Sequence, residues 1–407
     1  MLEALIAFVK IALLIGGLMT GAAYLVLLER WIAAWVQDRI GPNRVGIPLT
    51  KIRLFGLGQP LADGLKFILK EEYTPAHVDK FLYTLAPISI LTAALAAFAV
   101  IPFGSVLPKD GVPGVPGTIE LLAAPQIDVG LIYVFALSSI AVYGVILGGW
   151  ASNNKYSFLG GLRSSAQLIA YELPMGLGIL GIVLLSGSLR LDTIVGQQAQ
   201  SGLWNVAVEP IGFIVFLVAA FAESARLPFD LPEAEQELIG GYHTEYSAVR
   251  LLMYLVAEFL HMITAAFLIV ILYFGGWHFW GLTGSSDDIG WVQAILRVVI
   301  LGAKVMAVIL FFMMARWSWP RFRFDQLMNL AWKVMLPLGM VNLVAVAFLT
   351  ELCWNSKERQ LGGHFVLGLV AMWILAIASW WLAGWLAPLA TDNRPRFELP
   401  PRPANQG

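Results

Sequence analysis

The sequence is poor in cysteine, and this shortage limits the chemistry that the chain can carry. It has one cysteine, Cys353, among 407 residues. A single thiol cannot build a disulfide framework, a structural zinc site or a cysteine-ligated iron–sulfur cluster. Any redox centre that takes part in its function is therefore expected on another chain.

The sequence is also poor in charge. Charged residues make up 13% of it and hydrophobic residues 58%, whereas an average soluble protein has about 25% charged residues. The net charge is -1, and no basic tract interleaved with aromatic residues is present, so nucleic acid is not an expected partner. No P-loop is present either, which excludes ATP hydrolysis of that kind. The composition indicates a protein embedded in a lipid bilayer.

Nine apolar runs are long enough to cross about 30 Å of hydrocarbon. They cover residues 4–28, 82–103, 129–150, 164–187, 206–223, 249–274, 291–315, 331–350 and 365–389. The first run is too long for the core of a signal peptide, and Glu3 replaces the basic residues that would precede one, so we expect a retained helix. The predicted fold is all-α, a polytopic membrane bundle of about nine helices.

Lysine and arginine are distributed unevenly between the two sides of this bundle. Most of the 26 basic residues lie in alternate loops and in the C-terminal tail. Because basic loops remain on the cytoplasmic side, the N-terminus is predicted to be periplasmic and the C-terminus cytoplasmic. The long first cytoplasmic loop contains an amphipathic pattern from Gln59 to Lys70, with Asp63 off the apolar face. It predicts an interfacial helix, which serves either as a surface anchor or as a wall of a lipid-entry site.

An acidic stretch between the fifth and sixth runs, residues 221–247, is the main candidate for chemistry. Its six carboxylates are Glu223, Asp230, Glu233, Glu235, Glu237 and Glu245. Against them stand Arg226 and His243. Crowded carboxylates beside lipid cannot all stay ionised, so the stretch is expected to hold and pass protons. The alternative is that Asp230 and Glu233 only cap a helix.

Two acids are predicted inside the membrane. Glu172 lies in the fourth run, two residues before Pro174, and Glu258 lies in the sixth. A charge at that depth costs about 2.5–3.5 kcal/mol, so each of these acids is expected to have a function. The acids either carry protons or pair with Lys304 in the seventh run to hold helices together. Pro174 is expected to loosen its helix and admit water beside Glu172.

Three further patterns are weaker. Glu258 and His261 form one Glu-x-x-His pair, whereas a di-iron bundle needs two. Gly176, Gly178 and Gly181 match a nucleotide-binding pattern, but they lie inside a membrane run and predict close helix packing instead. The loop at residues 316–325 combines three arginines with four aromatic residues, as in an interfacial belt or a docking edge for a soluble partner.

These segments together resemble the H subunit family of bacterial NADH-quinone oxidoreductase, the counterpart of mitochondrial subunit one of respiratory complex I. The resemblance covers residues 1–350 and depends on four motifs. They are Glu29-Arg30 with DRIGPNRVG (38–46), QPLADGLKFILKE (59–71), GGWASNNKYSFLGGLRSSAQLIAYELPMGL (148–177) and AESARLPFDLPEAEQELIGGYHTEYS (222–247).

The resemblance implies a subunit of a proton-pumping enzyme in the bacterial inner membrane. Its quinone-binding residues would be Arg30, Arg39, Asp63 and Arg226. Its proton path would comprise eight acids: Glu172, Glu223, Asp230, Glu233, Glu235, Glu237, Glu245 and Glu258. No cofactor would be bound covalently. Quinone would be the substrate, with flavin and iron–sulfur clusters on peripheral-arm subunits and with small and antiporter-like membrane subunits as further partners.

The chain departs from the family pattern at residues 47–58, which look longer than the usual link, and at residues 351–407, which add a ninth helix and a proline-rich tail to an eight-helix core. Two other functions remain open from the sequence. One is the ion-coupling subunit of a membrane-bound hydrogenase or formate hydrogenlyase. The other is a stand-alone secondary transporter, although we find no internal repeat.

Overall fold

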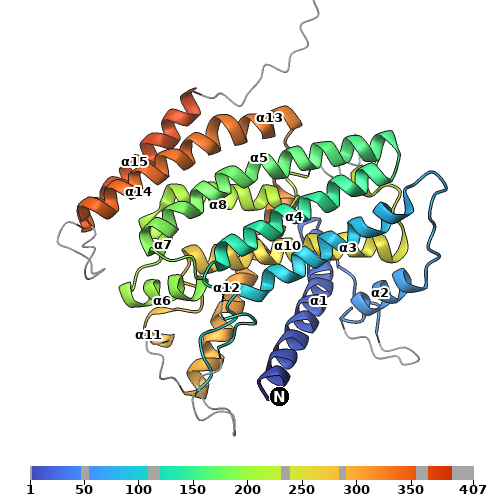
Figure 1. Cartoon of the computed structure of the whole chain (residues 1–407), viewed down its shortest axis with the longest axis horizontal. Helices are drawn as coiled ribbons and strands as arrows, with labels where there is room; N and C mark the ends of the chain where they lie inside the picture. The colour runs from blue at the N-terminus through green and yellow to red at the C-terminus, as the bar shows by residue number, and fades with distance from the viewer. Residues whose placement is uncertain are drawn as a thin grey trace, which may run out of the picture.

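A computed structural model describes residues 2–46, 55–108, 120–125, 127–230, 239–283, 290–353 and 365–386. Within these ranges the chain is a bundle of helices, and the pairing of Val106 with Glu120 is an isolated bridge (Figure 1). The all-α prediction is confirmed. Residues 47–54 and 231–238 lie outside the described ranges, and so do the tail beyond 386 and the predicted acids Glu233, Glu235 and Glu237.

Eight helical segments in the described part are long and apolar enough to cross a membrane. They are formed by α1 (Leu2–Val36), α3 (Lys80–Ala96) with a 3-10 turn (Ala97–Val100), α4 (Gly130–Ala151), α5 (Lys155–Ser186), α10 (Ala248–Tyr273), α12 (Trp291–Ser318), α13 to α14 (Phe324–Asn329, the π-helix Leu330–Met335 and Leu336–Cys353), and α15 (Phe365–Leu386). The fifth predicted helix is the shorter α8 (Pro210–Glu223), whose 14 residues reach about 21 Å. The short helices are α2 (Gln59–Leu69), α6 (Leu191–Ser201), α7 (Asn205–Val208), η2 (Gly241–His243) and α11 (Trp280–Thr283).

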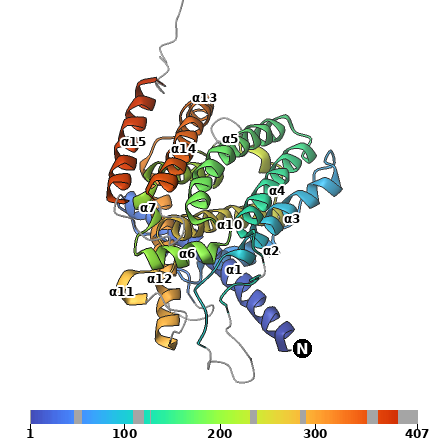
Figure 2. The ribbon, with the colours of Figure 1, turned by 60° about the vertical axis from the view of Figure 1, so that its left-hand side comes forward.

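Helix α10 forms the centre of the bundle. From Met262 to Tyr273 every side chain is buried, because α10 is packed against α1, α3, α8 and α12 (Figures 1 and 2). A helix that is apolar all round suits such a position. The first four predicted runs, with α8, α10 and α12, surround the cavities described below.

Glycines allow the helices beside α10 to approach closely. A Cβ on Gly178 of α5 would lie 3.1 Å from the carbonyl oxygen of Gly212 on α8, and one on Gly144 of α4 would lie 2.9 Å from Ile90 Cβ on α3. A Cβ on Gly181 would meet the Glu209 carboxylate at 2.7 Å, whereas one on Gly176 would meet nothing within 4 Å. The packing role is therefore confirmed for Gly178 and Gly181. Helix α5 runs on through Pro174, so the predicted loosening there is not observed.

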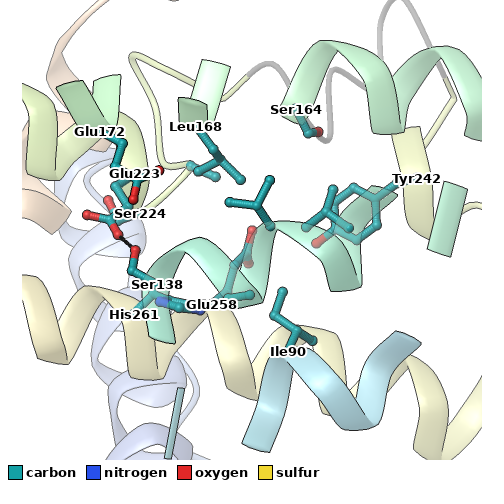
Figure 3. A pocket seen from close by; sticks show the side chains of 14 residues that line it. Ile90, Ser138, Ser164, Leu168, Glu172, Glu223, Ser224, Tyr242, Glu258 and His261 are labelled. Atoms are coloured by element: carbon teal, nitrogen blue, oxygen red, sulfur yellow. Dashed lines mark hydrogen bonds between the residues drawn. The ribbon is translucent and has the colours of Figure 1, made fainter. Parts of the chain in front are cut away.

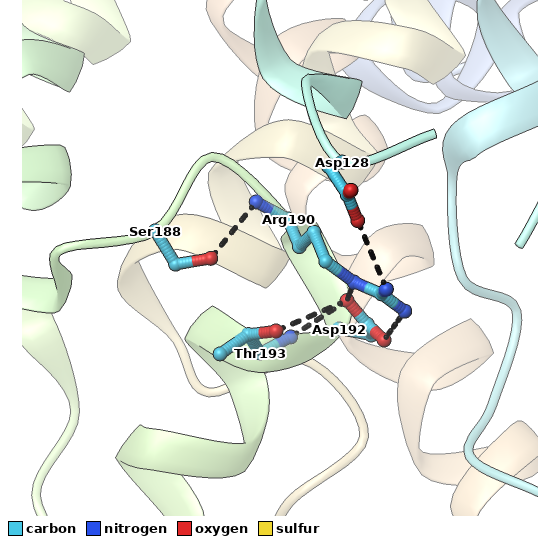
Figure 4. Close-up of polar contacts among 5 residues, drawn as sticks. All are labelled: Asp128, Ser188, Arg190, Asp192 and Thr193. Atoms are coloured by element: carbon cyan, nitrogen blue, oxygen red, sulfur yellow. Dashed lines mark hydrogen bonds and ion pairs between the residues drawn. The ribbon is translucent and has the colours of Figure 1, made fainter. Parts of the chain in front are cut away.

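Outside the long helices, polar contacts fix several turns. Figure 4 shows Arg190 at the start of α6, where its guanidinium donates to Asp192 Oδ2 at 2.8 Å and to Asp128 Oδ1 at 3.2 Å. Burial alone would raise the pKa of Asp192, but hydrogen bonds from Arg190 and Thr193 hold it below its ordinary value. This cluster connects the segment before α4 to the α5–α6 turn.

Helix α2 confirms the predicted amphipathic segment, although it ends at Leu69. It buries none of its residues, and the side chains of Leu61, Leu65, Ile68 and Leu69 are all exposed in the isolated chain. The ninth helix, α15, packs against α14, α8 and α7. Its Trp373 Nε1 donates to the Ala207 carbonyl oxygen at 3.0 Å, and Met372 is buried beside Val208 and Val346.

Candidate functional site

A cavity of about 710 Å³ lies between α1, α2, α10 and the end of α12. Its walls are mostly apolar, and all four predicted quinone-binding residues, Arg30, Arg39, Asp63 and Arg226, line it. Arg30 Nη1 donates to Asp63 Oδ2 at 2.7 Å, which connects α1 to α2. The exposed Arg39 Nε donates to Gln37 Oε1 at 2.8 Å. A large apolar cavity with a few convergent polar groups is typical of a site for a small amphipathic molecule.

Four charged side chains meet at the inner end of this cavity. The buried Arg226 donates from Nη1 to Glu29 Oε2 at 2.9 Å, and its Nη2 lies 3.8 Å from Glu258 Oε2. Arg316 of α12 contacts the other oxygen of Glu29, and the Arg226 guanidinium lies 4.2 Å from the centroid of the Phe259 ring. Sequence reasoning missed Glu29 and Arg316 as site residues. Each of these two residues is a charge near the C-terminal end of a mostly apolar helix, and this position could have indicated a role at the site.

Behind this network, a second cavity of about 50 Å³ lies between α4, α5, α8 and α10 (Figure 3). We call it the acid pocket, because Glu172, Glu223 and Glu258 line it together with His261. At about 10–15 Å³ for each water, it has room for about three to five molecules. Glu258 lines the large cavity as well, so this one carboxyl borders both spaces.

Serines of α4 position two of the acids in this pocket. Ser138 donates to Glu223 and Ser139 donates to Glu172, as Figure 3 shows for the first pair. A further small cavity continues from Glu223 and His261 along α10. The predicted intramembrane acids therefore share one small cavity with room for water. Ser138, Ser139 and His261 were not predicted to belong to it.

Asp230 lies apart from the acid pocket, under the loop at residues 316–325. It is buried and accepts from Arg321 Nη2 at 2.8 Å. In the same contact, Phe322 N donates to the Pro228 carbonyl oxygen at 3.1 Å, and the Phe322 ring stacks on Phe229 at 5.4 Å. The aromatic and basic loop thus packs against the acidic stretch of its own chain. Burial lowers the pKa of the nearby His243, and the charge of Asp230 opposes that shift.

Glu245 is also separate from the acid pocket. Its carboxylate accepts from Asn154 Nδ2 at 2.5 Å, and its backbone carbonyl accepts from the Tyr83 hydroxyl at 2.7 Å. Glu245 therefore does not line the acid pocket, and the packed rings of Tyr83, Tyr246 and Tyr254 lie beside it, so its place in the proton path stays a prediction.

Lys304 does not hold the intramembrane acids together. Its Nζ donates to the carbonyl oxygens of Phe274, Gly276 and His278 at 2.7, 3.0 and 2.7 Å. These groups lie just beyond the C-terminal end of α10. The lysine thus satisfies backbone acceptors of a turn, and the alternative of acids paired with Lys304 does not describe this bundle.

Comparison with known proteins places the chain in a family. Residues 9–347 match the NADH dehydrogenase family, and α15 lies beyond the match. The chain is 45% identical to the H subunit of NADH-quinone oxidoreductase from Leptospira biflexa over 359 residues, which cover 87% of this chain and 97% of that protein. It is 46% identical to an H subunit of the same enzyme from Geobacter metallireducens over 351 residues, 86% of this chain and 98% of that protein.

Other relatives are H subunits of this enzyme as well. One from Geobacter sulfurreducens is 45% identical over 335 residues, 82% of this chain and 93% of that protein. The hydrogenase and transporter alternatives gain no support from these relatives. The chain is a multi-pass membrane protein and belongs to the H subunit family of NADH-quinone oxidoreductase, respiratory complex I.

Proposed function

We propose that the large cavity forms part of a quinone chamber and that the chain couples quinone reduction to proton translocation through the acid pocket. The observation that carries the proposal is the position of Glu258, which borders both the cavity and the pocket. In this proposal, Arg30, Arg39, Asp63 and Arg226 line the chamber. Electrons come from the flavin and iron–sulfur clusters of peripheral-arm subunits docked on the cytoplasmic face, which is the face of α2 and the loop at residues 316–325.

The charges at the chamber's inner end suit this chemistry. Reduction of a quinone takes up two protons and passes through anionic forms. An anion in the cavity would attract Arg226 and Arg316 and so weaken their hold on Glu29 and Glu258. A carboxylate that loses part of its cationic neighbourhood binds a proton more readily. Glu258 would take that proton from the side of the acid pocket and share it with Glu172 and Glu223, from which it passes to the antiporter-like subunits.

The test replaces Glu172 by glutamine, which keeps the shape and the hydrogen bond from Ser139 but cannot ionise. Glu172→Gln should leave the complex assembled while lowering quinone-linked NADH oxidation and proton pumping in inverted membrane vesicles together. Glu351→Gln, at an exposed site near the end of α14, is the matched control.

NADH oxidation by an artificial acceptor that bypasses quinone should stay normal in both variants, because the flavin lies on another subunit. If Glu172→Gln pumps and turns over like Glu351→Gln, the acid pocket has no proton role. If the variant fails to assemble, its carboxyl holds helices together instead.

A further inference from the structure

Four tyrosines from three elements form one buried stack beside the acid pocket. Tyr83 of α3 lies parallel to Tyr246 with ring centroids 4.1 Å apart. The other two contacts are edge-to-face: the ring centroids of Tyr246 and Tyr254 of α10 are 4.9 Å apart, and those of Tyr254 and Tyr242 of η2 are 5.2 Å apart. Each side chain is at most 4% exposed. The stack is therefore continuous, and its rings exclude bulk water.

Hydroxyl groups in such a stack require an explanation. Phenylalanine would fill the same space without the cost of burying a polar group. The Tyr83 hydroxyl donates to Glu245 O at 2.7 Å and the Tyr254 hydroxyl to Gly144 O at 3.3 Å. The Tyr246 hydroxyl makes no hydrogen bond of good geometry among the described residues, although the side chains of Tyr254 and Ser152 lie close enough to interact with it.

A glycine makes room for these hydroxyls on α4. A Cβ on Gly148 would lie 2.3 Å from the Tyr254 hydroxyl oxygen and 3.6 Å from that of Tyr246. The two oxygens thus flank the same point of the helix surface. Any larger residue at position 148 would push the Tyr254 hydroxyl away.

The stack lies between two different spaces, the acid pocket and a groove. At one end Tyr242 lines the acid pocket, and Figure 3 shows its ring facing the space in front of Glu258. At the other end Glu245 accepts a hydrogen bond from Asn154, which lines an open groove of about 430 Å³ beside His77 and Asp79. This groove shares no lining residue with the large cavity.

We propose that Glu245 and the tyrosine stack form a proton inlet from this groove to the acid pocket, separate from the quinone cavity. The inference rests on the proposed proton role of the acid pocket. It gives Glu245 a role on the outer side of the stack, and it explains why the ring positions carry hydroxyls.

Each step of the inlet moves one proton and makes or breaks only O–H bonds. Glu245 takes a proton from water in the groove. Each tyrosine oxygen accepts the incoming proton while its own proton passes to the next acceptor, so every hydroxyl remains neutral. Rotation about the C–O bond then returns the hydroxyl hydrogen to its original orientation. Burial raises the pKa of Tyr246, so its hydroxyl keeps a proton to pass. On the other side of Glu258, the permanent charge of Arg226 repels an incoming proton, which favours a separate inlet.

The decisive variant is Tyr246→Phe, which keeps the ring and removes the hydroxyl that lies beside Tyr254 and Ser152. Tyr143→Phe is the matched control, because Tyr143 is exposed on the outer face of α4. In inverted vesicles containing the whole complex, Tyr246→Phe should lower the proton-pumping rate and coupled quinone turnover severalfold and leave heat stability unchanged or raised. Glu245→Gln and Gly148→Ala should have the same effect on pumping.

The outcomes separate this inference from the proposed function. If Glu172→Gln stops pumping while Tyr246→Phe and Glu245→Gln behave like Tyr143→Phe, the inlet is refuted and the acid pocket retains its role. If Glu172→Gln is also normal, the proposed function fails first and the inlet fails with it. Loss of heat stability in Tyr246→Phe, with a normal ratio of protons to electrons in all three inlet variants, would show that the stack is only packing.

Discussion

Gly160 of α5 offers a test of how η2 is packed, because the backbone of Gly241 and Tyr242 lies directly against it. A Cβ at this position would lie 2.7 Å from both Gly241 Cα and Gly241 C, and 2.8 Å from Tyr242 N. Backbone atoms cannot rotate away as the end of a side chain can, so Gly160→Ala must move η2 or α5. Overpacking of this kind costs about 1–3 kcal/mol, whereas alanine in a helix gains up to about 1 kcal/mol over glycine.

Gly176→Ala in the same helix is the control, since its Cβ would meet nothing within 4 Å and only the helix gain applies. The two variants should therefore differ by about 1–3 kcal/mol, which corresponds to about 5- to 150-fold. We expect faster heat inactivation of quinone reductase activity in membranes for Gly160→Ala, and lower turnover because Tyr242 moves relative to the acid pocket. Equal heat resistance and equal turnover of the two variants would refute the close contact.

Three further predictions use other parts of the structure. Lys304→Met leaves three carbonyl oxygens beyond α10 without their donor, and each unsatisfied buried group costs about 1–3 kcal/mol of stability. Heat stability should therefore fall while the ratio of protons pumped to electrons transferred stays normal. A changed ratio would show that Lys304 takes part in proton transfer. Burial lowers the pKa of His243, so the unfolded chain binds a proton at this residue more readily than the folded chain, and stability should be lost as the pH falls through the ordinary histidine value of 6.5 and below. His243→Gln should reduce the loss of heat stability between pH 7.5 and 5.5. An identical loss in both proteins would contradict this prediction. With Cys353 removed, single cysteines at the exposed Asn153 and Asp128 should react with an impermeant reagent from the cytoplasmic and periplasmic sides respectively, and labelling of both from one side would contradict the topology.

The sequence predicted the helices well, because an apolar run long enough to cross a bilayer has few alternatives. It misjudged the ends where charges are paired. The first run was expected to end at residue 28, yet α1 continues to Val36, because Glu29 and Arg30 find partners on α2, α12 and the segment after α8. The fifth helix begins at Pro210 rather than at residue 206, where the separate turn of α7 lies.

The candidate site was predicted unevenly for a related reason. A carboxylate inside an apolar run is visible in the sequence, so Glu172 and Glu258 were found, but their partners come from other helices. Glu29 and Arg316 are 287 positions apart, and no local pattern connects them. Glu245 was grouped with the acids near it in the sequence, whereas in the structure it lies outside the acid pocket, beside the stacked rings of Tyr83 and Tyr246.

The helix that lies beyond the family match, α15, adds one crossing to the predicted topology. α14 runs away from the loop at residues 316–325, and α15 returns along it (Figure 1). The topology prediction counts the shorter α8 beside the eight longer segments, so it has nine crossings and puts the start of α1 and the end of α15 on opposite faces. Under that topology and the proposed docking of peripheral-arm subunits beside α2, a fluorescent protein fused after α15 should compete with the docked subunits for space, whereas one fused before α1 should not.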